Sequence, residues 1–143
     1  MRKFLILSLV FVFSVRVYTQ NSTLPDVVSK AFEQKYPKAK KVKWSSENID
    51  DFQAEFALDS LNCTAVFSNK GVWQQTGIDV PPPILLASIH ALIKKNYPKS
   101  KITRASKIST SKNKTYYEIE LRKNEELEYI YFDEAGNELS SLK

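Results

Sequence analysis

The sequence predicts an α+β fold in which a unit of one helix plus three to four antiparallel strands occurs twice in tandem. The stretch 35–40, KYPKAK, returns as NYPKSK at 96–101. Two further pairs of stretches match at a common, slightly wider spacing: 52–56 with 117–121, and 67–71 with 132–136. These matches predict two structural repeats, at residues 22–78 and 79–143, with four additional residues in a loop of the second repeat.

The segment before the first repeat predicts a signal peptide at residues 1–19. A short basic head is followed at 4–15 by twelve residues that are apolar except for Ser8 and Ser14. Such a run is too short to span a bilayer as a helix and has the length of a signal-peptide core. We therefore expect a single domain at 20–143 that is periplasmic or secreted and does not insert into a membrane after cleavage. An uncleaved N-terminal anchor is the alternative.

Removal of this segment changes the class of partner that the charge favours. Arg2, Lys3 and Arg16 leave with it, so the formal net charge falls from +5 to +2. A chain with so little net charge attracts a polyanion weakly. We therefore do not expect nucleic acid to be a partner.

The first repeat begins with a helix predicted at 24–36. Pro25 falls in its first turn, where the missing N–H costs nothing, and Pro37 ends it. The apolar stripe of this helix consists of Leu24, Val27, Val28, Ala31, Phe32 and Tyr36. Alternating apolar and polar residues then predict strands at 41–44, 52–56 and 63–67, with a short fourth strand starting at 72–73.

The second repeat follows a linker predicted at 77–83, which contains three consecutive prolines. The apolar stripe of its helix consists of Leu85, Ile89, Leu92, Ile93 and Tyr97, and Pro98 ends the helix. Strands are predicted at 102–108, 116–122 and 126–133, with a last short strand at 138–139. Because one helix covers only part of a sheet, we expect both helices on one face of a continuous antiparallel sheet, with the other face in water.

Alternation along the strands divides the side chains between these two faces. The core face receives Phe52, Ala54, Phe56, Ala65, Phe67, Tyr117, Ile119, Leu121, Ile130 and Phe132. On the solvated face we expect a partner-binding surface made of Tyr116, Glu118, Glu120, Tyr129, Tyr131, Glu55 and Val66. Tyrosine is enriched where proteins dock on one another. The alternative is that these tyrosines serve only as good cross-strand neighbours.

Few residues are available for catalysis or for binding a metal. His90 is the only histidine and Cys63 the only cysteine, which leaves no Ser–His or Cys–His set and too few ligands for zinc. Glu118 and Glu120 could act as an acid–base pair, but a flat, wet strand gives little desolvation to shift a pKa. We therefore expect no catalytic site, no metal site and no cofactor. We expect Cys63 to be a small apolar residue on a strand face, and a reactive thiol is the alternative.

The pattern of the first repeat resembles a known family. The residues that carry the resemblance are Leu24-Pro25-x-x-Val28-x-x-Ala31-Phe32-x-x-x-Tyr36-Pro37, Trp44, Phe52-x-Ala54-x-Phe56 and Phe67-x-x-x-Gly71. They are similar to the β-lactamase-inhibitor-like, PepSY-like domains of exported bacterial proteins. The second repeat departs from the pattern, since it has no counterpart of Trp44. The resemblance implies a tandem helix-plus-sheet fold and an address outside the cytoplasm, but it implies no reaction.

These observations together favour a binding protein over an enzyme. We expect a non-catalytic exported binding module, monomeric, that binds a protein partner through the exposed sheet face in the manner of an inhibitor or an envelope-associated protein. The alternative is an envelope or stress protein that binds a small ligand or a cation without enzymatic activity.

Overall fold

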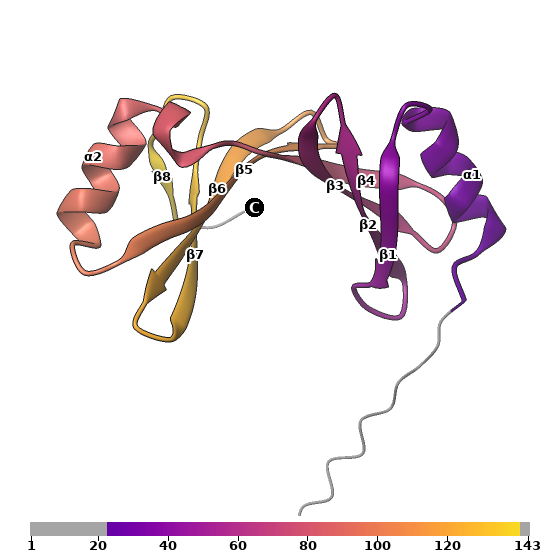
Figure 1. Ribbon diagram of the computed structural model, residues 1–143, viewed down its shortest axis with the longest axis horizontal. Coiled ribbons are helices and arrows are strands. Elements are labelled where there is room, and N and C mark those ends of the chain that lie inside the picture. The colour runs from indigo at the N-terminus through magenta and orange to yellow at the C-terminus, as the bar shows by residue number, and fades with distance from the viewer. Residues whose placement is uncertain (1–22, 141–143) are drawn as a thin grey trace, which may run out of the picture.

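The computed structural model describes residues 23–140, which form two α-helices, one 3-10 turn and eight strands (Figure 1). In chain order these are α1 (Asp26–Lys35), β1 (Lys40–Ser46), β2 (Asp51–Leu58), β3 (Leu61–Ser68), β4 (Trp73–Asp79), η1 (Pro82–Ile84), α2 (Ala87–Asn96), β5 (Lys101–Thr110), β6 (Thr115–Lys123), β7 (Glu126–Phe132) and β8 (Glu138–Leu139). The predicted signal peptide lies outside the described residues. Neither described α-helix has the length and hydropathy needed to cross a membrane.

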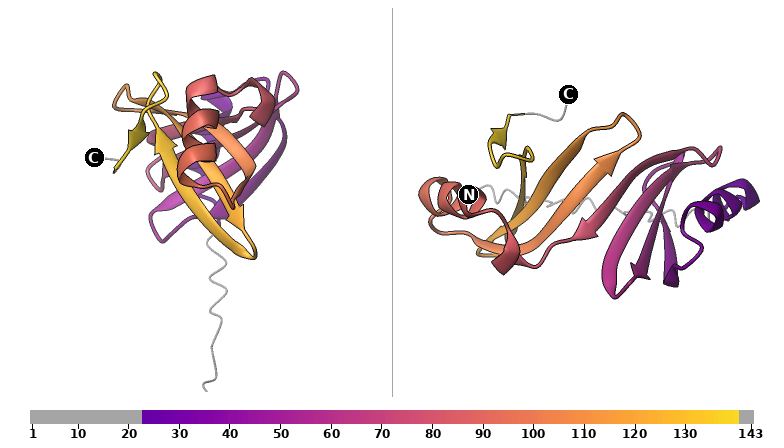
Figure 2. Two further views of the ribbon diagram at one scale, coloured as in Figure 1. Left: turned by 90° about the vertical axis from the view of Figure 1, so that its left-hand side faces the viewer. Right: turned by 90° about the horizontal axis from the view of Figure 1, so that it is seen from above.

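The eight strands form one sheet whose spatial order, β1 to β8, is also their order in the chain. Every neighbouring pair is antiparallel, which confirms the predicted α+β class and the continuous antiparallel sheet. The two helices lie at opposite ends of the elongated sheet (Figures 1 and 2).

Strand β4 joins the two halves of the sheet, and the predicted linker at 77–83 is wrong over residues 77–79. Gly77 and Asp79 belong to β4 and pair with Ile108 and Ser106 of β5. Residues 74–77 are two glutamines, a threonine and a glycine, so they show no apolar alternation. Pairing with β3 on one side and β5 on the other holds this polar stretch extended. Strand formation here depends on neighbours rather than on intrinsic preference.

Helix α1 packs a cluster of large side chains against β2 and β3. Val28 and Phe32 are its buried residues. The buried residues of this first core are Val28, Phe32, Phe52, Ala54, Phe56, Cys63, Ala65 and Phe67. Trp44 and Tyr36, both partly buried, pack against the same cluster. The helix stripe and the alternating strands therefore meet as their periodicities predict, except that Val27 of the predicted stripe is 48% exposed.

Helix α2 covers a second core that is built in the same way. Ile89 and Ile93 are its buried residues. The buried residues of this second core are Leu85, Ile89, Ile93, Ala105, Ile119, Leu121, Ile130 and Phe132. Tyr117, which alternation also assigned to the core, is only partly buried and packs at the margin of the cluster.

A tight turn ends in glycine beneath the N-terminal part of each helix. Gly71 and Gly136, the last residues of the matched stretches 67–71 and 132–136, have φ angles of +76° and +85°. A Cβ built on Gly71 would lie 2.8 Å from the carbonyl oxygen of Val27 in α1, and one on Gly136 would collide with Oγ of Ser88 in α2. Both positions therefore combine a left-handed backbone with a close approach to a helix, which glycine accommodates.

Gly71→Ala is expected to destabilise the protein by about 1–3 kcal/mol, because alanine is strained at positive φ and its Cβ would meet backbone that cannot rotate away. Urea unfolding followed by circular dichroism measures the change. Lys70→Ala, at the exposed neighbouring turn position, is the control and should leave the midpoint nearly unchanged. Equal midpoints for Gly71→Ala and the native protein would contradict this account.

A β-bulge lies near the start of the first strand in each half. The register shifts between Lys40 and Lys43 in β1, and between Ile102 and Arg104 in β5. Lys43 and Arg104 occupy equivalent positions of the two repeats, because the shift that relates stretch 35–40 to stretch 96–101 also relates these two residues. An extra residue in one strand changes which side chains face which way. Beyond the bulges, Lys43 lies opposite Glu55 and Arg104 lies opposite Glu120.

Candidate functional site

The strand register places the seven predicted binding residues on one face of the sheet. Glu55 pairs with Thr64, and the row continues through Gly77 and Ile108 to Tyr116 in β6. Residues that lie directly opposite one another share a face, and so do residues two apart in one strand. The face that carries Glu55, Val66, Tyr116, Glu118, Glu120, Tyr129 and Tyr131 is called the tyrosine face below.

Pairing brings five of the seven together and leaves two apart. Glu118 lies opposite Tyr131 and Glu120 opposite Tyr129, with Tyr116 two residues along β6. Glu55 and Val66 lie in β2 and β3, in the other half of the sheet. The predicted set is therefore one compact group plus two positions across the β4–β5 junction.

The expectation that the whole face is wet is wrong for Val66 and Tyr116, which are each 9% exposed. The Tyr116 ring packs edge-on to the Tyr131 ring, with 5.9 Å between the ring centroids. Val66 lies between Gln53 of β2 and Gln75 of β4, whose long side chains flank it on both sides. Tyr129, by contrast, is 49% exposed. Cross-strand neighbours therefore remove two of the seven residues from direct contact with a partner.

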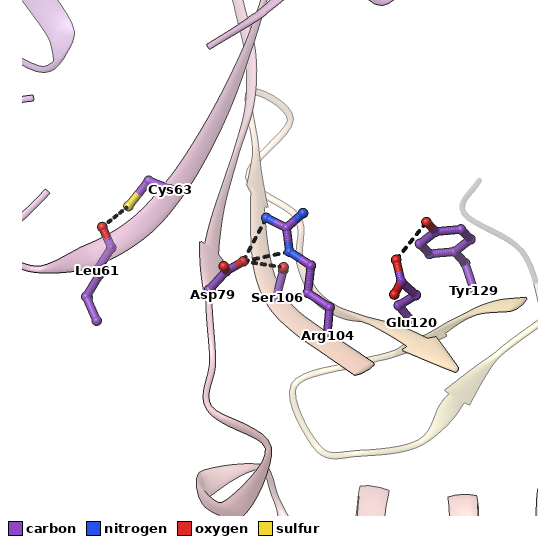
Figure 3. A network of polar contacts seen from close by, with 7 residues as sticks. All are labelled: Leu61, Cys63, Asp79, Arg104, Ser106, Glu120 and Tyr129. Carbon is purple, nitrogen blue, oxygen red and sulfur yellow. Dashed lines mark hydrogen bonds and ion pairs between the residues drawn. The ribbon is translucent and has the colours of Figure 1, made fainter. Parts of the chain in front are cut away.

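An ion pair crosses the junction between the two halves of the sheet. The Arg104 side chain of β5 donates from Nε and Nη2, both at 2.9 Å, to Oδ1 of Asp79 in β4 (Figure 3). The Ser106 hydroxyl donates to the same oxygen at 3.1 Å, and Ser106 is buried. Sequence reasoning missed this group, because Asp79 was assigned to a linker and the bulge that directs Arg104 leaves no pattern in the sequence.

Glu120 is held as a carboxylate by two hydroxyl groups. Tyr129 donates to Oε2 at 2.9 Å (Figure 3). Thr103 donates to Oε1. The hydrogen bond from Thr103, followed by that from Tyr129, lowers the pKa of Glu120 below its usual value. The bond to Glu120 in turn raises the pKa of Tyr129. These interactions fix the orientation of an exposed tyrosine ring.

Glu118 is in a different environment from Glu120. Burial raises the pKa of Glu118, and the nearby charge of Arg104 and a hydrogen bond from Tyr131 oppose this effect only in part. Within residues 23–140, no ion pair is formed by the Glu118 carboxylate. The expectation that a flat strand gives little desolvation is therefore wrong here, because Glu118 is partly buried.

A hollow of about 370 Å³ opens on the tyrosine face and draws on both halves of the sheet. The residues that line it are Glu47, Gln53, Thr64, Gln75, Arg104, Ser106, Ile108, Glu118, Tyr129 and Tyr131. Its walls are polar and aromatic, and each strand from β2 to β7 contributes to them. Such a hollow can receive a side chain or a small polar group from a partner.

His90 and Cys63 each contact a backbone carbonyl group of a neighbouring part of the fold. His90 Nε2 lies 2.8 Å from the carbonyl oxygen of Pro82, so the imidazole ties α2 to η1. Cys63 is 3% exposed, and burial raises the pKa of its thiol, which lies 3.8 Å from the Leu61 carbonyl oxygen (Figure 3). A buried thiol with a raised pKa is a poor nucleophile. Among residues 23–140, no three His, Cys, Asp or Glu side chains come together as metal ligands.

Comparison with known proteins places the fold among proteins of Bacteroides. The structure is similar to a DUF2874 family protein from Bacteroides ovatus, with 21% identity, 82% of this chain and 86% of that chain covered, and a TM-score of 0.69. It is similar to a protein from Bacteroides eggerthii described as one of its "putative periplasmic proteins" (18%, 80% and 85% covered, TM-score 0.69). It is also similar to a BLIP-like protein from Bacteroides fragilis (17%, 80% and 83% covered, TM-score 0.65).

At these identities the structural likeness concerns the fold alone, and a search of the curated proteins found no match. The sequence itself matches a family model described as "Putative beta-lactamase-inhibitor-like, PepSY-like" over residues 15–60 and 50–139. These two matches together span most of the chain, in agreement with the resemblance seen in the sequence pattern. The chain therefore belongs to the β-lactamase-inhibitor-like, PepSY-like family.

Proposed function

We propose that the protein is a non-catalytic, exported binding module that docks a protein partner on the tyrosine face. The observation that carries the proposal is the hollow on that face, which has polar and aromatic walls supplied by both halves of the sheet. Tyrosine and arginine are the side chains enriched in protein interfaces, and both lie there. The inhibitor-like family and the periplasmic description of a structural neighbour support the same proposal.

The proposal includes a duplicated scaffold that leaves the tyrosine face uncovered. A row of paired residues runs from Phe56 through Cys63, Ile78 and Lys107 to Tyr117, and so links the two cores along one side of the sheet. We infer that both helices cover that side. Equivalent bulges and equivalent glycine turns support the division into repeats at 22–78 and 79–143.

We further infer how the protein reaches its partner. Cleavage of the predicted signal peptide after residue 19 would release residues 20–143 into the periplasm or the medium as a monomer, without membrane insertion. The partner is then a protein of the envelope or the surroundings of the cell.

Replacing Tyr129 and Tyr131 together by serine is expected to weaken partner binding about 30-fold or more, because tyrosine is enriched among the hot-spot residues whose removal costs about 2 kcal/mol or more. Affinity capture from envelope extract, followed by titration of the captured partner, measures the loss. Ile84→Ser is the control, since it removes a 72%-exposed apolar side chain in η1. A folded double variant that captures the same partner with unchanged affinity would refute the proposed function.

A further inference from the structure

Glu118 is the least compensated of the three acids that extend from β4 and β6 on the tyrosine face. Asp79 accepts hydrogen bonds from Arg104 and Ser106, and Glu120 accepts them from Tyr129 and Thr103. Glu118 has the nearby charge of Arg104 and a hydrogen bond from Tyr131, but it forms no ion pair within residues 23–140. A partly buried carboxylate whose nearest positive charge is already paired with another acid is costly for a fold to maintain.

Comparison of the two halves shows that this acid is not part of the shared scaffold. The pair Arg104–Glu120 has a counterpart in Lys43–Glu55, at equivalent bulges. At the spacing that relates 52–56 to 117–121, however, the counterparts of Glu118, Tyr129 and Tyr131 are Gln53, Thr64 and Val66. One half therefore builds the same strands with a neutral amide where the other half has a desolvated carboxylate. All of these side chains except that of Val66 line the same hollow.

The sign of the uncompensated charge in the hollow is negative. Arg104 is the basic residue that lines it, and Asp79 pairs with its guanidinium at 2.9 Å. Glu47 adds a second carboxylate to the wall. The Tyr129 and Tyr131 rings supply aromatic surface on which a guanidinium or ammonium group can lie. Carboxylate and aromatic ring together are the chemistry that recognises a cation.

We propose that the hollow receives a basic side chain, arginine in preference to lysine, from a protruding segment of the protein partner, with Glu118 as its counter-ion. The proposal rests on the proposed function, because it takes the tyrosine face to be the docking surface. Arginine fits better than lysine, since its planar guanidinium can pair with the carboxylate through two N–H groups while stacking on a ring.

The test is selection of a phage-displayed library of randomised cyclic octapeptides on the full chain, with the affinity of each selected peptide then measured. The expected binders share a basic residue at one position, and replacing that residue by leucine weakens them at least about tenfold. Glu118→Gln, which places the amide of the first half in the second, should weaken the same peptides by a similar factor. Glu128→Gln, which neutralises an exposed acid on the opposite side of β7, is the control and should leave their affinity unchanged.

Four results would overturn the inference, and they separate it from the proposed function. Peptides that need Tyr129 and Tyr131 but share no basic residue would support docking on the tyrosine face and contradict the basic ligand. Peptides that need both tyrosines but bind Glu118→Gln with unchanged affinity would do the same. Peptides that bind regardless of Tyr129, Tyr131 and Glu118 would argue against both proposals. A library that yields no binder to the native protein would also overturn the basic-ligand inference.

The thermal unfolding midpoint of Glu118→Gln at neutral pH distinguishes a partner-binding role of Glu118 from a role in holding the fold. Burial raises the pKa of Glu118 in the folded protein. At pH values above that raised pKa the ionised side chain therefore lowers the free energy of unfolding. Removing the charge should therefore leave the midpoint unchanged or raise it while peptide binding falls. A lower midpoint would assign Glu118 to the scaffold and overturn its role as a counter-ion for the partner.

Discussion

Phe32→Ala is expected to destabilise the protein by about 3–5 kcal/mol, the range for removing a buried aromatic ring from a core. Phe32 is 3% exposed and lies at the centre of the first core. The surrounding rings belong to Tyr36, Trp44, Phe56 and Phe67, with centroids 5.0–6.1 Å from that of Phe32. Because four rings converge on this one, the cavity left by alanine cannot close by the movement of a single neighbour.

Urea unfolding, followed by tryptophan fluorescence, measures the effect through Trp44, which contacts the Phe32 ring edge-on. Phe32→Leu is the matched control, since it keeps most of the apolar volume and should cost less than half as much. A loss below about 1 kcal/mol for Phe32→Ala would show that α1 is not anchored by this ring.

Ile119→Ala is expected to cost about 2–5 kcal/mol by the same mechanism in the second core. Ile119 is fully buried in β6, opposite Ile130 of β7 and Ala105 of β5. Ile119→Val removes one methyl group and should cost only about 0.5–1.5 kcal/mol, which makes it the graded control. A cost for alanine no greater than that for valine would contradict the packing described for this core.

The double variant of Phe32→Ala and Ile119→Ala tests how the two cores are coupled. The two residues belong to separate clusters with no buried residue in common. Well-separated sites add within about 0.3–0.5 kcal/mol, so the two losses should sum. A coupling energy above about 1 kcal/mol would show that the β4–β5 junction transmits packing from one core to the other.

Much of this fold follows from apolar periodicity, because the strands that bury one face show it most clearly. Phe52, Ala54 and Phe56 are all buried, as strict alternation predicted, and so are Ile119 and Leu121. Prolines 37 and 98 end the helices where predicted, since α1 and α2 stop at Lys35 and Asn96. These features are local, and each is readable from a few neighbouring residues.

Other features depend on partners that are distant in the sequence, and periodicity does not register them. Residues 77–79 of β4 are extended because β3 and β5 pair with them. Arg104 reaches Asp79 because of a bulge whose position has no apolar signature. The hydrogen bond that Glu118 accepts comes from Tyr131 in the next strand. The tyrosine face could be predicted as a set of residues, but its hollow and its charge balance could not.

The chain-order sheet has a consequence for how the protein acquires its structure. Since each strand pairs with the one made just before it, no strand waits for a distant segment to arrive. Topologies dominated by such short-range contacts form quickly. Residues up to Asp79 contain α1 and β1–β4 and hold the whole first core, so this half can assemble before the remainder of the chain has been made. The emerging second half then extends a template that is already in place, by adding β5 to the waiting edge of β4.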